Sequence, residues 1–343
     1  MDTAKRIQTV RQHRPFTGNP VNTLASLTMP VLKTYPFSTA ARLLPLAAAA
    51  ALLTTVPAHA DTGKLLLTGG VSSVEGAAGG GISPWAVIGS QATEGEVGVS
   101  AYASRAVTRD YGLNAYGVAV GIHDRVELSL GHQNFDTGVT GTMLGLPGLH
   151  LKQDIVGAKL RVAGDAVLDS DSLMPQIAVG VQFKHLQSSG LDGTLSALGA
   201  KRSGTDVYVS ATKLFLAQGI LVNGTLRATQ ANQGGLLGFG ATLGGADNGY
   251  ELQPEISVAY LINSKLAVGV EYRAMPNKLQ RAGQAAGLGD GLRADDWKDI
   301  FIAYAPSKNV SITAAYVDLG RIVPATTSGR KQTGVYVSAQ IAF

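Results

Sequence analysis

The residues of this sequence that could do chemistry are charged side chains at alternating positions. Arg125 and Glu127 are two residues apart, as are Glu271 and Arg273, and this spacing places side chains on one face of a β-strand. Such a face predicts a hydrated interior that selects solutes by charge and size. Because both signs occur, a salt-bridge network across a narrow interior is the alternative. The candidates are Arg125, Glu127, Lys159, Arg161, Lys184, Arg227, Glu251, Glu255, Lys265, Glu271 and Arg273.

The histidines and glycine-rich stretches give weaker signals. Gly131–Asn134 (GHQN) is similar to the His/Asn neighbourhoods of outer-membrane lipid hydrolases, but no serine lies at a suitable spacing. No two of His123, His132, His150 and His185 have metal-ligand spacing. The stretches 76–81 and 287–291 lack the following helix and the Lys-Ser/Thr pair of a phosphate cradle. We therefore expect no enzyme, no metal and no cofactor.

The charged candidates belong to segments in which apolar residues alternate with small or polar ones. This period of two is typical of strands with one apolar and one polar environment. An Arg or Lys on a lipid-facing midplane position would cost about 2–4 kcal/mol, so the charged face must point inward. Twelve segments have the pattern: 96–105, 112–122, 125–131, 156–162, 176–184, 206–212, 220–227, 251–262, 265–273, 299–304, 310–316 and 331–343.

The joins between these segments alternate between short and long. Short joins lie at 123–124, 164–173, 216–218, 263–264 and 306–308, and long ones at 136–150, 188–203, 231–249, 276–294 and 320–330. Transmembrane barrels have short periplasmic turns and long outer loops. The sequence therefore predicts an all-β transmembrane antiparallel barrel of 12–14 strands. Residues 64–74 and 83–91 could add two strands, which we favour, or the segment could fold into the lumen as a plug.

The N-terminal region has the composition of an export signal. Arg42, the apolar run 43–53 and the sequence Ala58-His59-Ala60 predict a cleavable signal peptide over residues 29–60, with the mature chain starting at Asp61. Residues 1–28 are then an upstream start-site extension. Residues 1–60 hold six of the 28 basic residues and one of the 24 acidic ones, so the remainder is close to neutral. This excludes a nucleic-acid footprint.

Two stretches resemble known proteins. The segment GKLLLTGGVSSVEGAAGGGISPWAVIG (63–89), together with the closing strands, resembles a proteobacterial family of outer-membrane barrel proteins of unknown function. That resemblance implies a barrel in residues 61–343 and an envelope location, and it supplies no activity. The last strand resembles the C-terminal signal read by the barrel insertion machinery, carried by Val335, Val337, Ala339, Ile341 and Phe343.

From these patterns we expect a protein of the Gram-negative outer membrane. Its expected partners are membrane lipid, the insertion machinery and a small hydrophilic solute. The leading hypothesis is a narrow channel or uptake barrel. The alternative is a closed structural or ligand-binding barrel that acts through its outer loops and transports nothing.

Overall fold

The computed structural model describes residues 64, 67, 69–166, 173–188, 190–245 and 248–343. The predicted start-site extension and signal peptide lie outside these residues. Among the described residues, no helix is long and apolar enough to cross a membrane.

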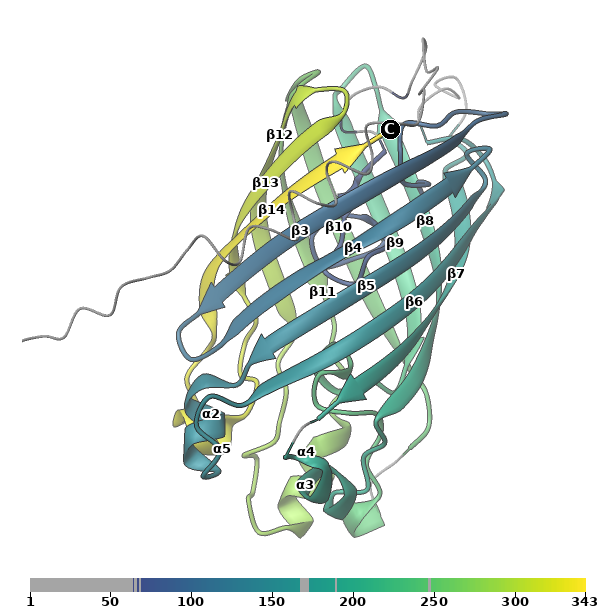
Figure 1. Ribbon diagram of the computed structural model, residues 1–343. Coiled ribbons are helices and arrows are strands. Elements are labelled where there is room, and N and C mark those ends of the chain that lie inside the picture. The colour runs from purple at the N-terminus through teal and green to yellow at the C-terminus, as the bar shows by residue number, and fades with distance from the viewer. Residues whose placement is uncertain (1–63, 65–66, 68, 167–172, 189, 246–247) are drawn as a thin grey trace, which may run out of the picture. The chain divides into compact units, whose positions relative to one another are not determined.

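Twelve antiparallel strands form a closed barrel in which each strand pairs with its neighbours in sequence and the last pairs with the first (Figure 1). The closing pair, β14 with β3, includes Ser338 opposite Ser104. The strands are β3 (Val97–Thr108), β4 (Gly112–Ile122), β5 (Val126–Asp136), β6 (His150–Ala163), β7 (Gln176–Gln187), β8 (Ser203–Phe215), β9 (Ile220–Thr229), β10 (Glu251–Asn263), β11 (Leu266–Arg273), β12 (Trp297–Ser307), β13 (Val310–Asp318) and β14 (Thr333–Ala342). All twelve segments predicted from alternation are confirmed.

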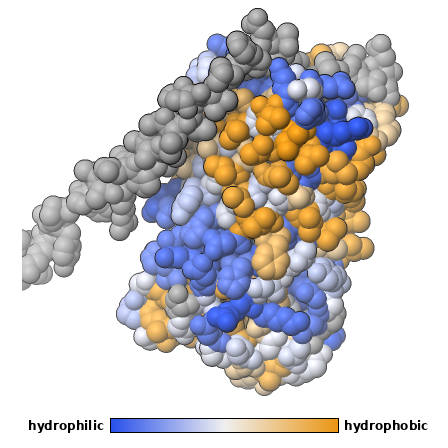
Figure 2. Space-filling model, turned by 45° about the vertical axis from the view of Figure 1, so that its right-hand side comes forward, coloured by the Kyte–Doolittle hydropathy of each residue, from blue (hydrophilic) through white to orange (hydrophobic). Residues whose placement is uncertain are grey.

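The alternation separates an apolar outer face from a polar inner one. On β5, Leu128 and Leu130 are exposed, while Glu127 and Ser129 are buried. Figure 2 shows apolar side chains gathered over the upper part of the wall, with hydrophilic ones between them and the loop end. This is the distribution expected of a wall that faces lipid over part of its height.

The two ends of the barrel differ, because the long loops lie at one end, together with the short join 109–111 between β3 and β4, and the remaining joins lie at the other end, called the short-turn end (Figure 1). The long loops carry short helices that pack on one another, and a cluster including Phe135, Leu151 and Leu186 forms an apolar core beneath them. The helices are α2 (Gly138–Met143), α3 (Asp192–Ala197), α4 (Lys278–Ala285) and α5 (Pro324–Thr327), with 3₁₀ turns η3 (Asn232–Gly235) and η4 (Leu243–Gly245).

The expectation of two additional wall strands was wrong, and the plug alternative is confirmed. Residues 71–90 are buried throughout and contribute only the two-residue strands β1 (Val71–Ser72) and β2 (Ala78–Gly79), which pair with each other. We call residues 69–92 the plug. It lies inside the barrel, and at the short-turn end Gln91 N donates to Phe343 O at 3.4 Å.

Candidate functional site

The plug is held by polar side chains of the barrel wall. Irregular backbone at membrane depth must find hydrogen-bond partners within the protein, because lipid offers none. Pro84 O accepts from Thr225 Oγ1 at 2.7 Å, and Ala86 N donates to Thr212 Oγ1 at 2.8 Å. Gln176 Nε2 donates to Ala86 O at 2.8 Å. The polar side chains of the inner face therefore supply the hydrogen-bond partners that a neighbouring strand would supply in a β-sheet.

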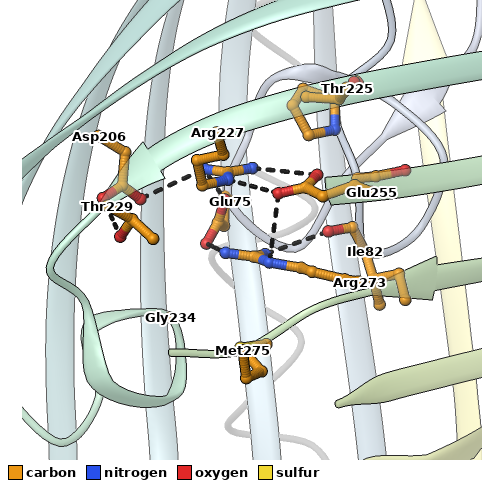
Figure 3. A network of polar contacts seen from close by, with 12 residues as sticks. Glu75, Ile82, Asp206, Thr225, Arg227, Thr229, Gly234, Glu255, Arg273 and Met275 are labelled. Atoms are coloured by element: carbon orange, nitrogen blue, oxygen red, sulfur yellow. Dashed lines mark hydrogen bonds and ion pairs between the residues drawn. The ribbon is translucent and has the colours of Figure 1, made fainter. Parts of the chain in front are cut away.

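Glu75 of the plug lies among three cations that come from three different strands, two of which, Arg227 and Arg273, are seen in Figure 3. Its Oε1 is 2.6 Å from Lys184 Nζ on β7 and 2.9 Å from Arg273 Nη2 on β11. Its Oε2 is 3.1 Å from Arg227 Nη1 on β9. Glu75 and all three cations are at most 3% exposed in their side chains. This cluster joins the plug to one side of the wall, the arc from β7 to β11.

Two wall carboxylates share these cations. Asp206 Oδ2 is 2.7 Å from Lys184 Nζ and 3.3 Å from Arg227 Nη1. Glu255 Oε1 is 2.5 Å from Arg227 Nε and 3.6 Å from Arg273 Nε. With Glu75, the cluster holds three positive and three negative groups, so it is neutral as a whole. We call Glu75, Lys184, Asp206, Arg227, Glu255 and Arg273 the six-charge cluster.

The electrostatics of the cluster favour the ionised form of Glu75. Burial alone would raise the pKa of this carboxyl, which lies in the plug and not in a spanning strand. The charges of Arg273, Lys184 and Arg227 outweigh burial, so the pKa of Glu75 is far below its ordinary value. The plug therefore brings a permanent negative charge to the wall.

A loop from the opposite end meets the plug at this level. The segment around η3, between β9 and β10, is buried, and Gly234 O accepts from Lys184 Nζ at 3.3 Å and from Gln153 Nε2 at 3.1 Å. Trp297 Nε1 donates to Gln233 Oε1 at 3.1 Å, and the guanidinium of Arg273 lies 5.5 Å from the Trp297 ring. The lumen is therefore filled from both ends, by the plug and by the loop around η3.

A second ion pair holds the part of the plug nearer the short-turn end. Glu127 Oε1 is 3.2 Å from Lys159 Nζ and accepts from Ala78 N at 3.0 Å. Glu127 Oε2 accepts from Gly89 N at 2.7 Å. Lys159 Nζ donates to Ala78 O and to Val87 O. The pair therefore holds two separate segments of the plug, one at Ala78 and the other at Val87 and Gly89.

A third group consists of two neighbouring carboxyls that have no cation beside them in the described part of the chain. Glu271 and Asp299 are directly opposite on β11 and β12. Glu271 accepts from Ser83 Oγ at 2.9 Å, from Ser257 Oγ at 2.7 Å and from Ile82 N at 3.0 Å. Among the described residues neither carboxyl has an ion pair within 4.0 Å. Glu271 therefore holds the plug by accepting hydrogen bonds.

The structure places the eleven charged residues singled out from the sequence in three settings. Seven are buried on the inner face: Glu127, Lys159, Lys184, Arg227, Glu255, Glu271 and Arg273. Arg161 is half-buried and pairs with Asp124 at 2.7 Å near the short turns. Arg125 and Lys265 are exposed at short turns, and Glu251 is half-buried at the loop end. The buried seven bind the plug or one another and do not face an open pore.

The sequence reasoning missed the plug's own charge and two wall acids. Glu75 is the only charged residue between Lys64 and Glu94, which was a usable signal in an otherwise neutral segment. Asp206 and Asp299 lay on the polar parity of recognised strands but were not selected. Their partners lie on neighbouring strands, so their role depends on the register between strands, and alternation carries no such information.

The histidines lie away from the lumen. His132, Asp154 and His185 form one row across β5, β6 and β7 on the outward parity, and His132 Nδ1 is 2.7 Å from Asp154 Oδ1. His185 Nδ1 is 2.7 Å from Ser203 Oγ. In a Ser-His-Asp triad the serine contacts His Nε2 and the acid contacts His Nδ1. Here Ser203 contacts Nδ1 of His185, so the two residues are not arranged as in a triad. No cluster of metal-ligating residues occurs in the described part of the chain.

The last strand has the polarity expected of it. Val335, Val337 and Ala339 are exposed on the outer face, and Ile341 and Phe343 are partly buried. The side chains between them, such as Tyr336 and Ser338, are buried. Recognition of this strand by the insertion machinery stays a prediction.

Comparison with known proteins places the chain in a family. The family model described as "Protein of unknown function (DUF3034)" matches residues 68–340. The chain belongs to this family. The DUF3034 match covers the plug as well as the barrel, which confirms the resemblance drawn from residues 63–89 and the closing strands.

Solved structures similar to this DUF3034 protein are outer-membrane barrels. They include the NanC porin (9% identity, 71% of this chain and 100% of that chain covered, TM-score 0.45) and the KdgM porin in complex with disordered oligogalacturonate (9%, 71% and 99%, 0.44). Outer membrane phospholipase A from Escherichia coli is similar too (9%, 72% and 92%, 0.38). At this distance the similarity concerns the fold alone. No curated protein matches the chain.

Proposed function

We propose that this protein is a gated channel of the outer membrane, exported by its signal peptide, whose lumen is closed at rest by its own N-terminal plug. Small hydrophilic solutes pass when the plug moves and the loop around η3 gives way with it. The observation that carries the proposal is that the twelve-stranded ladder closes, through β14 and β3, without any plug residue. The plug can therefore leave without breaking a wall strand.

The chemistry of the plug contacts supports a movable element. Besides apolar contacts of Val74, Ile82 and Trp85, the plug is held by side-chain hydrogen bonds and ion pairs that water can replace once it enters. A purely structural barrel would gain stability by filling its interior with apolar side chains, because buried ion pairs contribute little net stability. The polar lining instead suits an interior that is hydrated in one of its states.

A tethering experiment tests whether passage needs movement of the plug. Ser83 Oγ in the plug is 2.7 Å from Ser257 Oγ on β10, so the two side chains meet and sulfur atoms in their place could approach to the S–S length of about 2.05 Å. The chain has no cysteine. Oxidised Ser83→Cys/Ser257→Cys protein in planar bilayers should therefore lose the openings of the wild type, and reduction should restore them.

The matched control ties two wall strands together. Ser104 Oγ and Ser338 Oγ are 3.0 Å apart on β3 and β14. Oxidised Ser104→Cys/Ser338→Cys protein should open like the wild type. Conductance that persists in the oxidised plug variant would refute gating by the plug. If the wild type shows no openings, the channel hypothesis is rejected in favour of a closed barrel that acts through its outer loops. The loop around η3 would then seal the lumen.

A further inference from the structure

The wall part of the six-charge cluster carries an excess positive charge. Without Glu75 the wall contributes three cations, Lys184, Arg227 and Arg273, and two anions, Asp206 and Glu255. All five are at most 3% exposed. An uncompensated charge inside a protein is costly, so this part of the wall requires one further anion beside its three cations. In the closed barrel that anion is the carboxylate of Glu75.

The shape of the cluster fits a carboxylate that arrives from the lumen. The three cations come from β7, β9 and β11, and all three contact the Glu75 carboxylate; Figure 3 shows Arg227 and Arg273 on two sides of it. The planar fork of an Arg matches the two oxygens of a carboxylate. These cations belong to the wall, so they remain in place when the plug leaves.

Glu75 fills this site incompletely. Its Oε1 accepts hydrogen bonds from Lys184 and Arg273. Its Oε2 is buried and lies near Arg227, but it has no hydrogen-bond partner among the described residues. A free carboxylate can orient both oxygens, whereas that of Glu75 is constrained by the plug backbone. A small anion can therefore compete with it.

We propose that Lys184, Arg227 and Arg273 form a carboxylate-binding site in the lumen and that Glu75 is its built-in ligand. Under the proposed function, on which this assignment of a solute class rests, a small carboxylate replaces Glu75 when the plug moves. The solutes that the barrel favours are then organic acids, and the plug carries a mimic of their charged group.

Chemical rescue tests the site without requiring transport. Glu75→Ala removes the carboxylate and leaves space for a small one. The thermal unfolding midpoint of this variant should lie below that of the wild type. It should rise with acetate concentration until the site saturates, because a ligand that binds only the folded state stabilises it. Acetamide and equal sodium chloride should produce no such rise.

A second variant isolates the charge argument. Glu75→Ala/Lys184→Met leaves Arg227 and Arg273 against Asp206 and Glu255, so the wall needs no further anion. Its unfolding midpoint should not respond to acetate. Equal responses of both variants, or equal effects of acetate and acetamide on Glu75→Ala, would overturn the proposal.

Refolding yield covers the case in which Glu75→Ala does not fold in plain buffer. Recovery of folded barrel in acetate, and not in acetamide, supports the site. Failure to fold in acetate while the double variant folds overturns it. Either result is independent of the tethering experiment, so the site can fail while plug gating stands, and the reverse.

Discussion

Two plug glycines lie so close to other atoms that no β-carbon fits. A β-carbon on Gly79 would lie 2.2 Å from Ser83 O and 2.7 Å from Pro84 Cα, both within the plug. One on Gly80 would lie 1.9 Å from Glu271 Oε1. The glycines of this segment therefore allow its backbone to lie close to other plug backbone and to wall side chains. They form neither a phosphate cradle nor an extended strand.

Gly79→Ala is expected to loosen the plug while the barrel stays folded. Overpacking of this kind costs about 1–3 kcal/mol, and here the clash is with backbone that cannot rotate away. Ser73→Cys provides a reporter, because Ser73 is 1% exposed and its Oγ has no partner among the described residues. Maleimide labelling of this cysteine should be faster in the Gly79→Ala background.

Gly224→Ala is the matched control for that measurement. A β-carbon at Gly224, on β9, meets nothing within 4 Å, so labelling should stay at the background rate. Equal labelling of the Gly79→Ala and Gly224→Ala proteins would mean that the tight turn of the plug is not needed for docking.

The sequence predicts which charged residues point into the lumen, but it does not predict what they contact there. Lys159 and Lys184 were assigned inward because an outward charge at membrane depth is too costly. Lys159 contacts Glu127 and a plug carbonyl, and Lys184 contacts Glu75 and Asp206. The plug contacts among these depend on where the plug lies. An inward charge is compatible with an open pore or a closed one, and only the partner decides between them.

Strands were predictable wherever the two faces of an element meet different surroundings. β3 to β14 have lipid on one side and polar protein on the other, so the residue types alternate. The plug is buried throughout residues 71–90, so its residues meet no difference between lipid and lumen that would make their types alternate. The two additional strands were favoured because they would start the first strand in the periplasm, and this topological argument does not distinguish a wall strand from a plug.

The long loops are joined by a link that depends on pH. Asp295, between α4 and β12, accepts from Arg321 Nε at 2.7 Å, from Arg321 Nη2 at 2.8 Å and from Arg321 N at 3.0 Å. These hydrogen bonds, with the Arg321 charge, lower the pKa of Asp295 below its ordinary value. A lowered pKa means that the link stabilises the fold above the ordinary pKa of about 4, and that this stabilisation is lost as pH falls below it.

Arg321→Gln should therefore reduce stability at neutral pH by about 1 kcal/mol, a modest value because both side chains are partly exposed. The difference from wild type in urea unfolding should shrink as the pH falls from 5 to 3, since protonated Asp295 loses the pairing in both proteins. Arg105→Gln is the control, because Arg105 bonds the neutral Asn114. A pH-independent difference for Arg321→Gln would contradict the link.

At the scale of the whole molecule, membrane location follows from the face of the barrel on which exposed apolar residues lie. Leu128, on β5, is 49% exposed, and its cross-strand neighbours Val120 and Ala158 share the outer face. Met143, at the end of α2, is 65% exposed but belongs to a long loop. In water the two residues would be equivalent exposed positions, whereas in a bilayer only Leu128 contacts hydrocarbon.

Leu128→Arg and Met143→Arg should therefore differ sharply in lipid vesicles. Arg at a lipid-facing position costs up to about 2–4 kcal/mol, the value at the midplane, whereas a loop surface substitution changes stability by no more than about 0.5 kcal/mol. Urea titration of protein refolded into vesicles measures both free energies of unfolding against the wild type. Equal values for the two variants would place the wall of β5 in water, and the outer-membrane assignment, with the channel that depends on it, would fail.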